Sequence, residues 1–173
     1  MLHNTKIIDA LNHLLSFELA AMDQYFLHAQ MYEDWGYTKL YERIAHEFDD
    51  EKGHATVLIQ RLLFLEGAPD MQTRTGFQIG SDVPSMLESD LRVEYAVADA
   101  LRENIALCEV EKDFVTRDML LTLLDDTEMD HAHWLEQQLR QIKHLGLEIV
   151  FLSKSFCENR QIYTLRANIL LLE

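Results

Sequence analysis

The sequence predicts an all-α protein built as a single four-helix bundle. Only 2 Pro and 6 Gly occur among 173 residues, whereas 48% of the residues are hydrophobic, and such a composition is typical of long, uninterrupted helices. Hydrophobic residues recur every three or four positions through four long segments, as the inward face of an antiparallel bundle requires. A chain of this length can bury a sizeable core.

The first two segments should form a helical hairpin. The first helix is expected over residues 6–34, where Trp35 and Gly36 break it, and the second over residues 38–65, ending before Pro69. Because the connection is short, the two helices should lie side by side and antiparallel. The inward stripes are expected to be Leu11, Leu15, Glu18, Met22, Tyr25 and Ala29, then Leu40, Ile44, Glu47, Glu51, His54 and Leu58.

A connection of roughly residues 66–84 is long enough to cross the bundle before the second hairpin. Ser81 or Asp82 can cap the third helix, and Pro84 suits its first turn. This helix should end near residue 111, and the fourth should span residues 114–145 and end at Gly146. The inward stripes are expected to be Leu87, Leu91, Glu94, Ala98, Leu101, Ile105 and Cys108, then Leu121, Leu124, Glu128, His131, Leu135, Gln138, Ile142 and Leu145.

Six of these inward positions carry acids or histidines where a plain bundle would carry Leu, Ile or Ala. They are Glu18, Glu51, His54, Glu94, Glu128 and His131. Burying a carboxylate without a partner costs several kcal/mol or more. Four helices that each bring an acid inward therefore need a compensating cation.

The two halves of the chain repeat this pattern in nearly the same register. Glu18 precedes Glu51 by 33 residues, and Glu94 precedes Glu128 by 34. Each second Glu begins a Glu-x-x-His motif, whose two members share one face of a helix. Related by a pseudo-twofold axis, the halves would bring together four carboxylates and two imidazoles, the ligand set of di-iron carboxylate bundles. Two ferrous ions would balance the four carboxylates, and this donor set suits iron or manganese better than copper.

Residues 1–147 resemble bacterioferritin, through the stretches LLSFELAAMDQYFLHAQMYEDWG, HEFDDEKGHA, LLFLEG and EMDHAHWLE. The resemblance implies a ferritin-like four-helix bundle with a long crossover between helices two and three. It also implies ferroxidase activity, the oxidation of Fe(II) to Fe(III) by oxygen or hydrogen peroxide. Ferric mineral would accumulate inside a hollow 24-subunit shell.

The resemblance assigns individual roles to the six inward residues. It implies that Glu51 and Glu128 bridge the two irons. The other four residues would be terminal ligands. Glu18 and His54 would bind one iron, and Glu94 and His131 would bind the other.

Several other residues match family positions through less specific patterns. His46 and Asp50 match an accessory iron site on the inner wall of the shell, although an exposed polar pair would give the same spacing. Tyr25 matches an aromatic residue that supplies an electron during turnover, and Trp134 fits a similar role. Both aromatic residues could equally be ordinary core residues.

Lys52 occupies the position of the methionine that binds haem in the family. A protonated lysine has no lone pair for iron. We therefore expect little or no haem b in a homo-oligomer. One alternative is that this subunit supplies ferroxidase activity in a mixed shell beside a separate haem-bearing subunit.

Charge and composition exclude several other classes of partner. A formal charge of −15 disfavours nucleic-acid backbones and anionic membranes, because both would repel the chain.

No apolar run reaches the ~20 residues that span a bilayer, and no signal peptide is recognisable, so a cytoplasmic protein is expected. Cys108 and Cys157 are too few for a disulfide framework or a cysteine metal site.

Two other functions stay open. A di-iron peroxidase or oxygen-detoxifying protein would use the same site without storage. A non-catalytic carrier subunit of a mixed shell would show a broken ligand set, whereas all six ligands are present here. Residues 148–173 depart from the family and form a divergent C-terminal tail, either a genuine extension or the product of an altered reading frame.

Overall fold

The computed structural model describes residues 4–76 and 78–147, and the tail predicted over residues 148–173 lies outside this part of the chain. The described residues form helices and connections, with no strand among them. The helices are α1 Thr5–Asp34, α2 Thr38–Phe64, α3 Val83–Glu111, α4 Phe114–Asp126, the π-helix η1 Thr127–Ala132, and α5 His133–Leu145. The chain divides into two units, Met1–Glu136 and Gln137–Glu173, and α5 continues from the first into the second.

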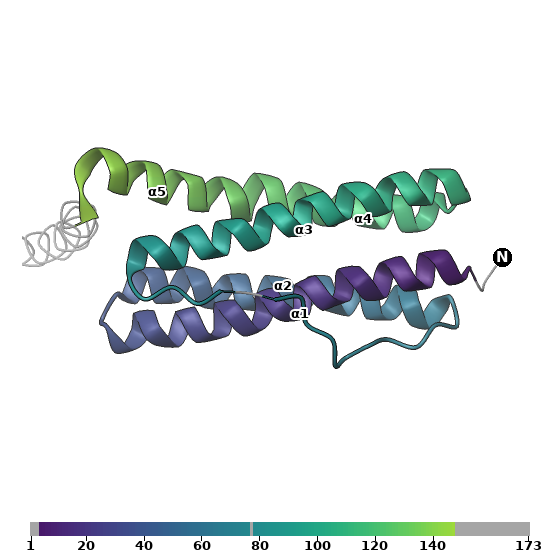
Figure 1. Ribbon diagram of the computed structural model, residues 1–173, viewed down its shortest axis with the longest axis horizontal. Coiled ribbons are helices and arrows are strands. Elements are labelled where there is room, and N and C mark those ends of the chain that lie inside the picture. The colour runs from purple at the N-terminus through teal and green to yellow at the C-terminus, as the bar shows by residue number, and fades with distance from the viewer. Residues whose placement is uncertain (1–3, 77, 148–173) are drawn as a thin grey trace, which may run out of the picture. The chain divides into compact units, whose positions relative to one another are not determined.

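Two helical hairpins build the first unit, as the sequence predicts. Helix α1 packs against α2, and α3 packs against α4 and η1, while α1 and α3 join the two hairpins. Figure 1 shows the long connection running from the end of α2 to the opposite end of the bundle, so α2 and α3 run in the same direction. This arrangement confirms the predicted bundle with a crossover between the second and third helices.

The crossover lies along α1 and is fixed to it by hydrogen bonds. Asn12 donates to the carbonyl of Ala68 at 3.1 Å and accepts from the amide of Asp70 at 2.8 Å. One turn further, the amide of Thr75 donates to the carbonyl of Ser16 at 3.1 Å. These contacts use the Asn12 side chain and the main-chain carbonyl of Ser16, so the apolar side chains of α1 remain available for the core.

The helix ends follow from local sequence. The Asn4 side chain caps α1, and Asp82 forms a capping box with Ser85 at the start of α3. Gly36 and Gly146 have φ values of 77° and 80°, a conformation that glycine adopts without steric cost and that ends a helix. The ends predicted from sequence are therefore confirmed to within about a residue.

Leucine, isoleucine and alanine side chains of the inward stripes fill the core, including Leu11, Leu15, Leu58 and Leu101. The stripes predicted for the first three helices are largely confirmed. The stripe predicted for the start of the fourth helix is wrong, because Leu121 is 40% exposed. The buried residues of α4 and η1 are instead Thr116, Leu120, Leu123, Thr127, His131 and Ala132.

The π-helix explains this displaced stripe. A π-helical turn contains more residues than an α-helical turn and occurs mostly as a single insertion within an α-helix. The wider turn of η1 keeps both Thr127 and His131 inward, four residues apart. The hydroxyl of Thr127 donates to the carbonyl of Leu123 at 2.9 Å.

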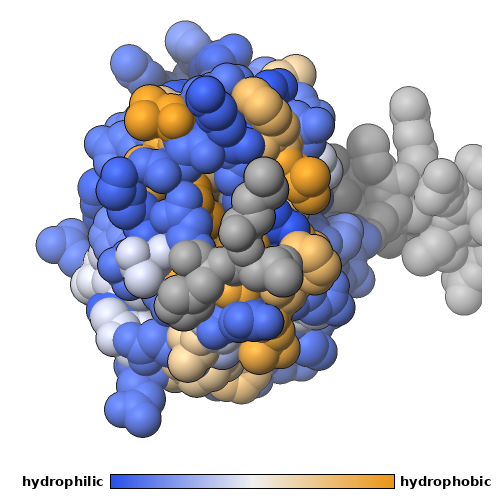
Figure 2. Space-filling view, turned by 90° about the vertical axis from the view of Figure 1, so that its right-hand side faces the viewer, coloured by the Kyte–Doolittle hydropathy of each residue, from blue (hydrophilic) through white to orange (hydrophobic). Residues whose placement is uncertain are grey.

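Exposed apolar side chains lie at the end of the bundle where α2 ends and α3 turns into α4. They are Leu63, Phe64, Val110, Phe114 and Val115. Figure 2 shows this end, with several hydrophobic groups separated by hydrophilic ones. Among the described residues, no helix is both long enough and apolar enough to cross a membrane.

Candidate metal centre

The centre of the bundle holds a buried cluster of three carboxylates and two imidazoles. Glu18 comes from α1, Glu51 and His54 from α2, Glu94 from α3, and His131 from η1, and all five are buried. Their potential ligand atoms form two groups, and within each group the atoms lie within 4.8 Å of one another. One group contains Glu18, Glu51 and His54, and the other contains Glu51, Glu94 and His131.

Glu51 belongs to both groups and joins them. Its Oε2 lies 3.2 Å from Nδ1 of His54, and its Oε1 lies 3.0 Å from Nδ1 of His131. The two imidazole rings are nearly parallel, with centroids 5.6 Å apart. A carboxylate that directs one oxygen to each half of a cluster is placed as a bridging ligand would be.

Several polar atoms of this cluster are buried without a hydrogen-bond partner in the described part of the chain. Both carboxylate oxygens of Glu18 and Oε2 of Glu94 are among them. An unpaired buried carboxylate is strongly unfavourable. Protons, on the carboxyl groups or on the imidazoles, or bound metal ions must therefore compensate for the burial of these acids.

Burial and mutual repulsion shift the protonation of the cluster. Burial, and then the negative charge of Glu51, raise the pKa of Glu18 and of Glu94. Burial opposes charge on the imidazoles, yet their carboxylate partners raise the pKa of His54 to about 11 and that of His131 to about 12. Without metal, the two histidines therefore carry the compensating positive charge.

The opposite effect acts on Glu51. Burial would raise its pKa, but its protonated neighbours Glu18, His131 and His54 hold the pKa of this carboxyl below its usual range. Glu51 is thus the anionic centre of the cluster.

Two carboxylates that were not predicted as site residues face the outer nitrogens of the imidazoles. Nε2 of His54 lies 2.9 Å from Oδ2 of Asp126, and Nε2 of His131 lies 3.1 Å from Oε2 of Glu47. In each ring Nδ1 therefore faces the cluster while Nε2 faces an outer acid, an arrangement that orients metal-binding histidines. Glu47 lies on the predicted inward stripe one turn before Glu51, and that position was the available signal. Nothing in the sequence pointed to Asp126.

Glu128, the sixth predicted ligand, lies outside the cluster. Its side chain is 41% exposed and forms an ion pair of 2.6 Å with Arg102 of α3. The physical reason is the wider turn of η1, because residues three apart share a face in an α-helix but not in a π-helix. The structure thus brings together five of the six predicted ligands.

Tyr25 contacts the cluster directly. Its hydroxyl donates a hydrogen bond to Oε1 of Glu94, and the side chain is almost fully buried. Burial, and then the negative charges of Glu94 and Asp90, raise its pKa above the usual value. Tyr25 is therefore protonated and stands beside a candidate metal ligand.

The remaining predicted site residues lie at or near the surface. Nδ1 of His46 is 3.3 Å from Oδ2 of Asp50, and the two side chains form an i,i+4 pair on α2. Lys52 is exposed. Arg43 lies over the ring of Trp134 at 5.3 Å from its centroid.

A second buried polar group lies between α1 and α3. Asp90 accepts hydrogen bonds from Gln24 at 2.6 Å and from Nδ1 of His28 at 2.7 Å, and the amide of Gly80 donates to Nε2 of His28 at 3.4 Å. His28 is therefore a core histidine that is paired with a buried carboxylate.

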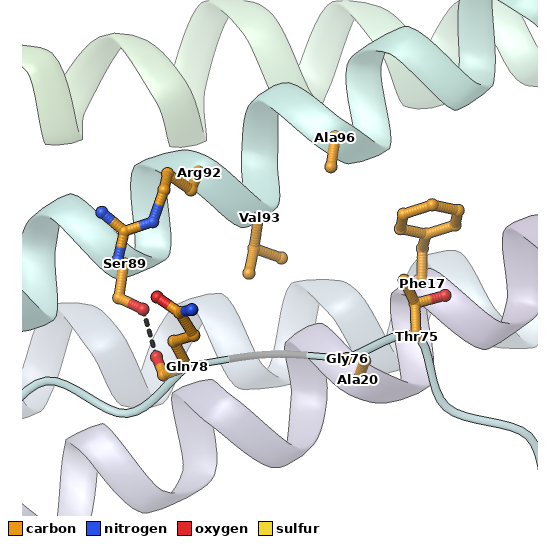
Figure 3. A pocket seen from close by; sticks show the side chains of 9 residues that line it. All are labelled: Phe17, Ala20, Thr75, Gly76, Gln78, Ser89, Arg92, Val93 and Ala96. Atoms are coloured by element: carbon orange, nitrogen blue, oxygen red, sulfur yellow. Dashed lines mark hydrogen bonds between the residues drawn. The ribbon is translucent and has the colours of Figure 1, made fainter.

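A pocket of about 250 Å³ opens between α1, α3 and the crossover (Figure 3). Phe17 and Val93 supply apolar walls, and Ser89 donates a hydrogen bond to the carbonyl of Gln78 at its edge. None of the cluster residues lines this pocket, so it is separate from the candidate metal centre.

The cluster fits two divalent cations by its donor chemistry. Carboxylate oxygens and imidazole nitrogens suit iron, manganese or zinc, and the unpartnered buried oxygens identify where positive charge is needed. A four-helix bundle with one long crossover and a cluster of carboxylates and imidazoles between its helices is typical of the class of ferritin-like, metal-binding bundle proteins.

Comparisons with known proteins agree with this class. The sequence model of the ferritin-like domain matches residues 8–145. The chain is 54% identical over 143 residues to "Bacterial ferritin" of Neisseria meningitidis serogroup B, covering 83% of this chain and 92% of that protein. It is 56% identical to "Bacterial ferritin" of Pseudomonas aeruginosa, with the same shares covered. It is 38% identical to "Bacterioferritin" of Brucella melitensis, over 83% of this chain and 88% of that protein.

The chain therefore belongs to the ferritin family. The resemblance to bacterioferritin predicted from its sequence is confirmed by these relatives. Their alignments cover about the same share of the chain as the helical bundle.

Proposed function

We propose that this protein stores iron and oxidises Fe(II) at the buried cluster. The observation that carries the proposal is the set of buried, unpartnered oxygens of Glu18 and Glu94 on either side of Glu51. Membership of the ferritin family supports iron as the metal. The stored product would be ferric mineral inside an assembled shell.

The chemistry requires two electrons and two sites for iron. Each Fe(II) loses one electron on becoming Fe(III), and O₂ takes up two electrons and two protons to give hydrogen peroxide. Two ferrous substrates held side by side can supply both electrons at once. Glu51, directed to both halves of the cluster, would hold the pair together.

The protein's own groups would carry the accompanying protons. His54 and His131 must lose the protons on Nδ1 before those atoms can bind a metal ion. Asp126 and Glu47 would keep the opposite nitrogens oriented outward. Tyr25, hydrogen bonded to Glu94, is placed to supply an electron or a proton beside the substrate.

Glu128 would join the cluster when metal arrives. With Glu18, Glu51 and Glu94 it supplies the fourth negative charge, which balances two divalent ions. Arg102 would not be left unpaired, because its Nη1 also contacts Asp99 at 2.6 Å. The Glu128 side chain is exposed and can therefore change rotamer at little cost.

The site assignment is tested by the rate of Fe(II) oxidation after oxygen is added, followed by near-ultraviolet absorbance. Glu18→Ala and His131→Ala should each reduce the rate to that of iron in buffer, because each removes a ligand from a different half of the cluster. Glu88→Ala, an exposed acid of α3, is the matched control and should oxidise iron normally. Unchanged rates in both ligand variants would rule out the assignment.

Two further variants separate oxidation from its supporting steps. Tyr25→Phe keeps the five clustered ligands and should bind iron normally but oxidise it more slowly. His46→Ala should leave the first turnover intact and slow the later deposition of mineral, if His46 and Asp50 form an accessory iron site. Equal mineral yields in His46→Ala and the unmodified protein would leave these residues as a surface ion pair.

We further propose a hollow shell of 24 subunits, homo-oligomeric or mixed with a haem-bearing subunit. The exposed Lys52 cannot ligate haem in its protonated form, so the homo-oligomer should lack a haem spectrum. Elution as a large, mineral-holding particle supports storage. A stable monomer or dimer that holds no mineral would favour the di-iron peroxidase alternative.

A further inference from the structure

A second set of carboxylates lies on the outer side of His131, facing away from Glu51. Nε2 of His131 is 3.1 Å from Glu47 and 3.9 Å from Asp50. Ligand atoms of Asp126 and Asp130 also lie within 4.8 Å of each other and of a ring nitrogen of His131. These acids range from a 2% exposed side chain at Glu47 to a 51% exposed one at Asp130. They therefore connect the buried cluster to the surface.

Arg43 is the cation that occupies this outer set. Its Nη2 lies 2.5 Å from Oε1 of Glu47 and 2.8 Å from Oδ1 of Asp130. The guanidinium also stacks over Trp134, with Cζ 5.3 Å from the ring centroid. An aromatic face attracts and positions a cation in this geometry. Three contacts from two helical segments thus hold one side chain that is only 21% exposed.

Glu47 lies against cationic groups rather than against ordinary hydrogen-bond donors. Neither carboxylate oxygen has a well-aligned hydrogen-bond partner among the described residues. The groups close to them are the guanidinium of Arg43 on one side and the imidazole of His131 on the other. Arginine remains protonated in proteins, so the positive charge beside Glu47 is permanent.

A guanidinium nitrogen between two carboxylates stands where a divalent ion would bind the same two acids. The arginine and the metal ion therefore exclude each other, because both are cations and both need Glu47. A metal ion that passes from the surface to His131 by way of Glu47 must displace Arg43 from that carboxylate.

We propose that Arg43 is an internal counter-cation that keeps Glu47 and Asp130 free of metal and gates the passage of ferrous iron between the surface and the buried cluster. This inference rests on the proposed function, since it concerns access to the same site. It assigns Arg43 a gating role that is distinct from ligand binding. Trp134 acts with it, as the platform that holds the guanidinium in place.

The experiment compares zinc binding to the intact, oxygen-free protein and three variants. Zinc is the probe because it binds carboxylates and imidazoles and undergoes no oxidation. The number of ions per subunit is measured by titration, and their positions by anomalous X-ray scattering at the zinc edge. Arg43→Gln removes the charge, and Arg43→Lys keeps it. Arg117→Gln removes an equivalent charge from an ion pair with Glu109 on another part of the bundle.

In the unmodified protein we expect zinc in the buried cluster and none on Glu47 and Asp130. Arg43→Gln should bind about one additional zinc ion per subunit, placed on Glu47 and Asp130. Arg43→Lys and Arg117→Gln should bind zinc as the unmodified protein does. Arg43→Met, which keeps an apolar stem against Trp134, gives the same comparison if the glutamine variant does not fold.

Two results would overturn the gating role. One is zinc bound to Glu47 and Asp130 in the unmodified protein while Arg43 keeps its position. The other is the same number and placement of zinc ions with and without the Arg43 charge. A different result would count against the proposed function itself: the unmodified protein would bind no zinc at Glu51.

Discussion

Glu51 contacts both imidazoles of the cluster through different oxygens, and this pattern explains how the site can exist without metal. Protons on His54 and His131 supply the positive charge that the buried acids require. A charged imidazole is protonated on both nitrogens, and in both rings it is Nδ1 that faces Glu51, where a metal ion would bind. Protons and metal ions therefore compete for Nδ1 of His54 and Nδ1 of His131.

This competition predicts that affinity for divalent metal rises with pH. The carboxylate partners raise the pKa of His54 to about 11 and of His131 to about 12, even though burial opposes this. Binding must release these protons, and each released proton contributes roughly a tenfold gain in affinity per pH unit. Zinc titration calorimetry between about pH 6 and 8, in buffers of different ionisation enthalpy, measures both the affinity and the protons released. An affinity independent of pH would contradict the assigned ligand atoms.

The same raised pKa values should make the metal-free protein less stable as pH rises, whereas they make metal binding stronger. A histidine with a raised pKa stabilises the fold fully below its unfolded-state value of about 6.5, and this stabilisation is lost as pH rises toward the folded-state pKa. Metal-free protein should therefore lose stability above about pH 6.5. Bound metal should restore it most strongly at the higher pH values.

At the scale of helices, η1 is the element that separates Glu128 from the other ligands. The turn is internal to a continuous helical segment from α4 to α5, and Glu128 pairs with Arg102 at its edge. A return of this turn to α-helical geometry would bring Glu128 onto the same face as His131. Helix insertions of this kind occur frequently at functional sites.

We expect divalent metal to draw Glu128 from Arg102 into the cluster. Because Glu128 would then balance the second cation, Glu128→Gln should weaken the second binding step while leaving the first nearly unchanged. Glu103→Gln, at an exposed position of α3, serves as the control. A metal-loaded structure with Glu128 still paired to Arg102, together with normal binding by Glu128→Gln, would remove this residue from the ligand set.

Helix ends and inward stripes could be predicted from the sequence, whereas contacts between helices could not. Hydrophobic spacing and caps depend on local sequence, so the helix ends and the inward stripes of α1, α2 and α3 could be predicted. The Glu-x-x-His pattern predicted an inward position for His131, and the structure buries this residue in η1. The position of Glu128 could not be predicted, since the spacing rule assumes an α-helix. Contacts between helices, such as His54 with Asp126 and Arg43 with Asp130, leave no periodic signal in the sequence.

At the scale of the whole molecule, the crossover joins two hairpins so that each contributes ligands to one cluster. Glu18, Glu51 and His54 come from the first hairpin, and Glu94 and His131 come from the second. The cluster therefore exists only when both hairpins are packed together. The apolar side chains exposed where α2 ends, including Leu63 and Phe64, are a surface that contact with another subunit could cover.

We propose that the buried cluster holds two iron ions and oxidises them as a pair. Mössbauer spectroscopy of the intact protein, given ⁵⁷Fe(II) without oxygen and then exposed to air, tests it most directly. We expect about two bound ferrous ions per subunit that become a magnetically coupled ferric pair, and neither signal in Glu18→Ala. Isolated ferric ions with no coupled pair, or equal spectra from the unmodified protein and Glu18→Ala, would contradict a paired iron site at this cluster.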